Sequence, residues 1–131
     1  MKNVVHFHSM DCLTANEYLT KYCDDFEKAD SQEKGNLFML TNGALFKLLN
    51  CPRQFVVDLE THGFLFSDEV ISFNDISNVT RRMMYVFGAI RHRTTSAWEN
   101  LPLFISIMRP YNEEVATKLQ ARWDAVSMLI R

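Results

Sequence analysis

The chain has 131 residues, of which 47% are apolar and 23% charged, and its formal net charge at pH 7 is −2. A chain of this size buries a hydrophobic core without disulfides or metals, so we expect residues 1–131 to form a single domain. The composition excludes a collagen, a coiled-coil rod, a disulfide-stapled toxin and a disordered chain, and no apolar run reaches the roughly 18 residues that cross a bilayer.

The cysteines, Cys12, Cys23 and Cys51, are odd in number and form no Cys-x-x-Cys pair. Secreted disulfide frameworks carry even numbers of cysteines in denser arrays. The first residues also lack the apolar stretch of about 7–15 residues that a signal peptide needs. We therefore expect a cytoplasmic protein with reduced thiols and no membrane contact.

The pattern predicts a mainly α-helical, compact domain of five or six helices. The first helix follows a short β-prone stretch and begins at a capping box, in which Thr14 and Glu17 exchange hydrogen bonds. A second box, at Asp30 and Glu33, is expected to open the next helix. Asn42-Gly43 interrupts this second helix, because glycine is unfavourable in a helix interior.

Pro52 ends the preceding piece and is expected to begin a third helix that runs to about residue 62. Gly63 stands where a C-terminal cap belongs. A strand over residues 55–57 is the competing interpretation.

Residues 64–73 are predicted to form a short β-hairpin, because apolar residues flank the polar turn Ser67-Asp68-Glu69. The order of short helix, tight turn, second helix and hairpin over residues 43–73 resembles the second half of a winged-helix domain. In that family the second helix enters the DNA major groove and the hairpin forms the wing. Here the second helix is short and nearly neutral, so the same shape could instead dock a protein.

Asp75 is expected to cap a long helix over residues 75–91, with one apolar stripe facing the core. Residues 96–102 are predicted to form a turn or a short helix, and residues 103–108 a buried apolar piece. The last helix is expected to start near Asn112.

Charge is divided unevenly, since residues 1–70 carry a net charge of −5 and residues 71–131 a net charge of +3. Seven of the eight later cations are arginines, which suit two-point contacts to carboxylate and phosphate. The candidate binding site is a cationic face of the 75–91 helix and the residues after it, with an aromatic ring beside the guanidinium groups. Its residues are Arg81, Arg82, Tyr85, Arg91 and Arg93.

This arginine face would fit an acidic protein surface or single-stranded nucleic acid. The alternative is that the basic half packs near the acidic half of the same molecule, while Arg91 and Arg93 stabilise the end of their helix.

The chain also carries 16 aromatic residues and seven methionines. Such residues are favoured at adaptable interfaces, so a homodimer or a docking groove is expected alongside core packing.

His6 and His8 would project from the same side of a strand, close to Asp11 and Cys12, and these are zinc-binding residue types. The string Val5-His6-Phe7-His8-Ser9 resembles the His-x-His-Ser opening of the polymerase-and-histidinol-phosphatase family of metal hydrolases. That family holds its metals with further ligands on a barrel that 131 residues cannot form. No metal, cofactor or catalytic residue is therefore predicted, and neither a phosphate-binding glycine loop nor a nucleophile elbow is present.

The sequence thus favours a small non-enzymatic regulator, adaptor or inhibitor that binds a larger protein complex, of the kind that phages and viruses also encode. The alternative is a nucleic-acid-binding protein that uses the winged-helix-like segment or the arginine face. A third hypothesis is a small metal-dependent enzyme that uses His6 and His8.

Overall fold

The computed structural model of the chain describes residues 13–91, 93 and 96–129, and these are mainly helical, as the sequence predicts. No β-strand occurs in this part of the chain. Its elements, in chain order, are α2 (Ala15–Lys28), α3 (Ser31–Thr41), α4 (Gly43–Phe46), α5 (Arg53–Thr61), α6 (Ser67–Asn74), α7 (Val79–Arg91), the 3-10 helix η2 (Trp98–Asn100), α8 (Leu101–Met108) and α9 (Glu113–Leu129).

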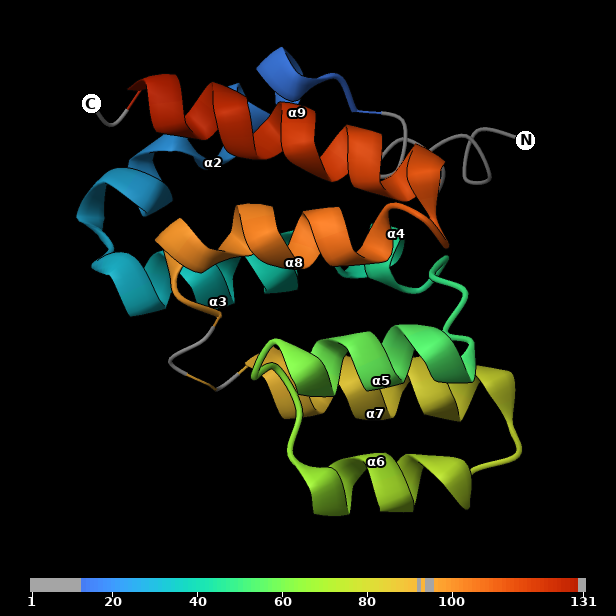
Figure 1. Cartoon of the computed structure of the whole chain (residues 1–131). Helices are drawn as coiled ribbons and strands as arrows, with labels where there is room; N and C mark the ends of the chain where they lie inside the picture. The colour runs from blue at the N-terminus through green and yellow to red at the C-terminus, as the bar shows by residue number, and fades with distance from the viewer. Residues whose placement is uncertain (1–12, 92, 94–95, 130–131) are drawn as a thin grey trace.

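The helices form two groups that share one hydrophobic core. In the first group α9 packs along α2 and α8, while α3 packs against η2. In the second group α6 contacts both α5 and α7 (Figure 1). The two groups meet where α5 contacts α8 and α7 contacts α3. Within the described residues, no helix is both long and apolar enough to cross a membrane.

Three of the predicted local signals that begin or end helices are confirmed. The Thr14 hydroxyl accepts a hydrogen bond from the Glu17 amide at 3.1 Å, and the Glu17 carboxylate accepts one from the Thr14 amide at 3.0 Å. Asp30 and Glu33 form the same reciprocal pair at the start of α3. Gly63 follows α5 with φ of 83°, the left-handed conformation that glycine adopts without strain.

The predicted hairpin over residues 64–73 is wrong, because Ser67, Asp68 and Glu69 form the first turn of α6 rather than a β-turn. The Glu69 carboxylate accepts a hydrogen bond from the Phe66 amide at 2.8 Å, which satisfies a donor that the helix start leaves free. Acidic residues at this position also interact favourably with the helix dipole. Without a strand, residues 43–73 cannot form a winged helix.

The long helix predicted from Asp75 to Arg91 is also shorter than expected. Asp75 follows the end of α6, and α7 begins only at Val79. The capping role belongs to Asn78, whose side-chain oxygen accepts a hydrogen bond from the Arg81 amide at 3.0 Å. The described residues therefore hold eight α-helices, where five or six were predicted, with α6 and α8 as separate elements.

Most of the aromatic and methionine side chains, which the sequence makes candidates for an interface, are packed in the core. Rings from α2, α3 and α9 meet at Trp98 of η2, which stacks on Trp123 with ring centres 5.0 Å apart. Phe26 and Phe38 contact the same indole at 5.4 and 5.6 Å. Met84 remains exposed on α7, and Met128 remains exposed on α9.

A buried polar network joins α2, the α3–α4 junction and α9. Arg122 is 2% exposed, and its guanidinium donates to the Asn42 side-chain oxygen at 2.6 Å and to the Leu13 carbonyl at 3.1 Å. The Asn42 amide nitrogen donates to the Tyr18 hydroxyl at 3.1 Å. Burial raises the pKa of Tyr18, so its hydroxyl stays protonated and bonds Thr41 at 2.6 Å. This network fixes where α9 lies across the earlier helices.

Candidate protein-binding surface

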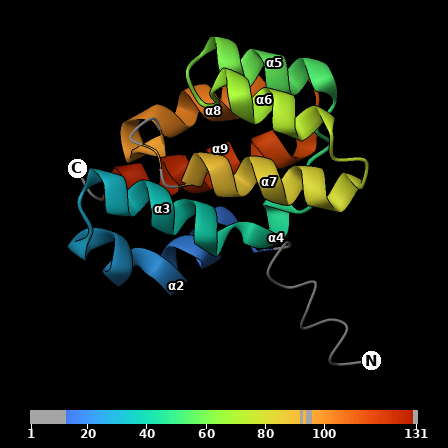
Figure 2. The same cartoon turned by 90° about the horizontal axis from the view of Figure 1, so that it is seen from below.

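The candidate surface is built around α7, which lies between α6 and α3. Figure 2 shows α7 running antiparallel to α6 on one side and along α3 on the other. Met83, Val86 and Ile90 face the core at helical spacing. The opposite side of the helix carries Arg81, Met84 and Gly88, all of which are exposed.

Two of the predicted site residues hold α6 against α7. The Arg93 guanidinium forms an ion pair with Glu69, donates to the Ala89 carbonyl at 2.8 Å and lies 3.9 Å from the centre of the Phe66 ring. The Arg82 guanidinium lies 5.0 Å from the Phe73 ring of α6. Both cations therefore have contacts within the chain that a partner would have to replace.

The other three predicted residues lie at different places on α7. Arg81 is exposed near the start of the helix, and Tyr85 packs its ring partly against the core. The Arg91 guanidinium lies 6.0 Å from the Phe87 ring and borders a polar hollow of about 180 Å³. Gln32, Glu33 and Asn36 of α3 complete that hollow. These three residues therefore have different surroundings along the helix.

A second hollow lies nearer the start of α7, between α7 and α4, and it is apolar. It has a volume of about 140 Å³ and is lined by Gly43, Phe46, Lys47, Met83, Met84 and Phe87. The rings of Phe46 and Phe87 pack 5.2 Å apart and join α4 to α7. Met84 is 58% exposed beside it, and exposed Lys47 supplies the only charged side chain of its lining.

The size and lining of this apolar hollow favour a protein side chain over a cofactor. Small-molecule sites usually enclose about 300–1,000 Å³ and hold several directed polar groups. The hollow is smaller, and its surface is almost wholly apolar. Methionine adapts its shape to different apolar partners, and fully buried anchors in such hollows contribute most of the energy of protein interfaces.

Sequence reasoning counted the methionines as candidates for an interface but did not find this hollow. Its two walls come from α4 and α7, which are separated in the chain by α5 and α6. No local spacing encodes this juxtaposition. The only local signal is Met84 itself, an apolar residue on the outward side of an amphipathic helix.

The remaining reactive groups have structural roles or lie elsewhere. Burial raises the pKa of Cys51 to about 11, so this thiol is protonated at neutral pH and a poor nucleophile. Tyr111 donates to the Asp58 carboxylate at 2.6 Å, which lowers the pKa of Asp58 and raises that of Tyr111. This bond ties α5 to the turn between α8 and α9.

His6, His8 and Cys12 lie outside the described residues, so the structure does not place the predicted histidine pair. In the part of the chain that the structure does describe, no three His, Cys, Asp or Glu side chains gather as metal ligands would. Comparison of the chain with models of protein families, with curated proteins and with solved structures found no match.

Proposed function

We propose that this protein is a regulator, adaptor or inhibitor that acts by binding another protein through the apolar hollow between α4 and α7. The partner inserts one apolar side chain between Phe46, Met84 and Phe87, and an acidic group beside that side chain meets Lys47. Binding of this kind needs no catalytic group.

One observation carries the proposal, namely an open apolar hollow next to an exposed methionine on a helix whose opposite side is buried in the core. Met84 lies on α7 between residues that are anchored in the core, so the hollow exists before the partner arrives. A preformed site loses little side-chain freedom on binding, and this favours affinity. Lys47 adds a directional charge at the rim, which favours an acidic neighbour over a basic one.

The test is affinity capture from lysate of the source cells, with wild-type protein and Met84→Asp compared side by side. An aspartate at the hollow places a charge where the partner's apolar side chain binds, so we expect the captured protein to be lost, with affinity lowered at least about tenfold, equivalent to about 1.4 kcal/mol. Stability should change little, because Met84 is already 58% exposed.

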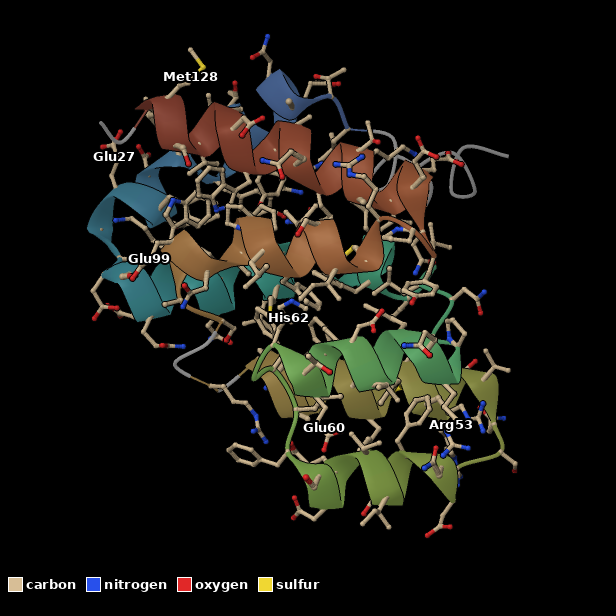
Figure 3. All side chains as sticks on the ribbon, viewed as in Figure 1. Glu27, Arg53, Glu60, His62, Glu99 and Met128 are labelled. Atoms are coloured by element: carbon tan, nitrogen blue, oxygen red, sulfur yellow. The ribbon has the colours of Figure 1, made fainter. Side chains whose placement is uncertain are left out.

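Met128→Asp is the matched control, since Met128 is 70% exposed and lies at the far end of α9 (Figure 3). Captured protein that survives nuclease, is kept by the control and is lost with Met84→Asp would support the proposal. Equal capture by both variants would refute it. Capture that disappears on nuclease treatment would instead favour nucleic-acid binding through the arginine face.

A further inference from the structure

The outward ridge of α6 is acidic at both ends and apolar in the middle. Asp68 and Ile71 of α6 and the C-cap residue Asp75, whose backbone is still helical, follow one another at spacings of three and four residues, so they lie on one side of the helix. Val70 and Phe73 face the core on the opposite side. Ile71 is 65% exposed, and among the described residues neither aspartate has an ion-pair partner.

The outward ridge of α7 has the opposite charges in the same arrangement. Arg81, Met84, Gly88 and Arg91 follow at spacings of three, four and three residues. Arginines stand at both ends, and the exposed Met84 and Gly88 lie between them. A β-carbon added at Gly88 would meet no atom within 4 Å, so packing within the chain does not require glycine there.

These two ridges are comparable in length and run along neighbouring antiparallel helices. The aspartates of α6 are about 10 Å apart and the arginines of α7 about 15 Å apart, at 1.5 Å per residue, a difference that arginine side chains can span. The two helices run antiparallel in one chain (Figure 2). A twofold axis parallel to them would place α6 of one copy on α7 of another, again antiparallel.

We propose that the protein forms a symmetric dimer in which the α6 ridge of each copy packs on the α7 ridge of the other. In this arrangement Asp75 meets the Arg81 end, Asp68 meets the Arg91 end, and Ile71 covers Met84 and Gly88. Both exposed apolar side chains are then buried twice, once in each half of the interface. The absence of a side chain at Gly88 lets the opposing helix approach closely.

The dimer goes beyond the proposed function but shares Met84 with it, so self-association and partner binding compete for α7. Raising the concentration of the protein would thus lower the fraction able to bind its partner. The competition arises only if the dimer forms. Partner binding in the hollow does not require the dimer.

Sedimentation velocity over a series of protein concentrations tests the dimer. We expect the mass to rise from 15.3 kDa toward twice that value, and the association to weaken as salt is added. Ile71→Asp should keep the chain monomeric, whereas Met128→Asp on the far side of the molecule should not (Figure 3). A wild-type chain that stays monomeric at its solubility limit, or a dimer indifferent to Ile71→Asp, would overturn the proposal.

Charge reversal gives a second test that does not depend on apolar packing. One variant carries Asp68→Arg with Asp75→Arg, and the other carries Arg81→Glu with Arg91→Glu. Each should be monomeric alone, because like charges then face one another, and a mixture of the two should form heterodimers. Circular dichroism of each variant confirms the fold, and folded variants that fail to associate on mixing would refute the pairing.

The outcomes separate this dimer from the proposed function. Loss of the dimer with Ile71→Asp, while partner capture persists, supports self-association through α6 that partner binding does not require. Partner capture that depends on Met84 in a chain that is always monomeric supports the proposed function and removes the dimer.

Discussion

Gly35 marks the closest approach between two segments far apart in the chain. A β-carbon at this position would lie 1.9 Å from the Ser96 carbonyl oxygen, which belongs to the backbone and cannot rotate away. Ser96 is itself fully buried, and its hydroxyl lies 2.8 Å from the Ile90 carbonyl at the end of α7. The glycine is therefore required by contact with the backbone of another segment.

We expect Gly35→Ala to lower the free energy of unfolding by about 3 kcal/mol, because α3 or the Ser96 segment must shift. Gly88→Ala is the matched control, since it meets no atom and should stabilise the helix by up to about 1 kcal/mol. Urea denaturation of dilute protein measures both. Equal effects of the two substitutions would contradict the close contact.

Cys51 gives a pH dependence whose sign follows from its burial. Its pKa is raised to about 11 in the folded chain from an ordinary value of 9.0. Above about pH 9 the unfolded chain loses the thiol proton while the folded chain keeps it, so the stability falls as the pH rises from about 9 to about 11. Below pH 9 this group has no effect on the pH profile.

The expected measurement is the difference in urea midpoint between wild type and Cys51→Ala. At pH 8 the wild type should be more stable, and its advantage should shrink steadily up to pH 11. Tyr18 also has a raised pKa, but it is present in both proteins and cancels in the difference. A difference that does not change with pH would show that the thiol is not buried.

At the scale of the elements, α6 depends on one carboxylate with two partners. Glu69 accepts from the Phe66 amide and forms the ion pair with Arg93 that joins α6 to the segment after α7. Glu69→Gln should lower the free energy of unfolding by about 2 kcal/mol, because Arg93 loses a partly buried counter-charge. It should also speed amide hydrogen exchange in α6 more than in α9.

Asp68→Asn is the control for this effect, since Asp68 is exposed on the same helix. In the double variant Glu69→Gln with Arg93→Gln, the effects of the two changes on the free energy of unfolding should not add, because each change removes the same ion pair. Additive effects in that cycle would mean that the contact does not stabilise the fold.

How far the sequence predicts these elements depends on whether their signals are local. The boxes at Thr14 and Asp30 use residues three apart, and they were predicted correctly. Ser67-Asp68-Glu69 fits both a turn and the first turn of a helix, and one of the two contacts of Glu69 is with Arg93, 24 positions away. The candidate site could not be predicted from local signals either, because Phe46 and Phe87 meet only through tertiary packing.

At the scale of the whole molecule, Arg122 contradicts the general expectation that arginine is exposed. It was counted with the basic half of the chain, yet it is buried and bound to Asn42, 80 positions away. The helical pattern of the sequence shows only that α9 has a polar residue at position 122. Which buried groups accept hydrogen bonds from Arg122 depends on how α2, α3 and α9 pack together.

If residues 1–131 form a single domain, as we predict, weakening this network should destabilise every element together. Arg122→Gln should lower the free energy of unfolding by about 3 kcal/mol and leave one transition. Arg53→Gln, at the exposed first residue of α5, should have almost no effect (Figure 3). Coincident denaturation curves from helix ellipticity and tryptophan fluorescence check this, and two separated transitions would indicate independent halves.

The pairing of α2 with α9 also sets an order of events during synthesis. Asn42 leaves the ribosome long before Arg122, and at about 5 to 20 residues per second the 80 intervening positions take roughly 4 to 16 s to translate. Throughout that interval α9 does not yet cover the aromatic side of α2, and the Asn42 side chain lacks its hydrogen bond from the Arg122 guanidinium. The nascent chain is thus most open to chaperones, and most prone to aggregate, just before α9 emerges.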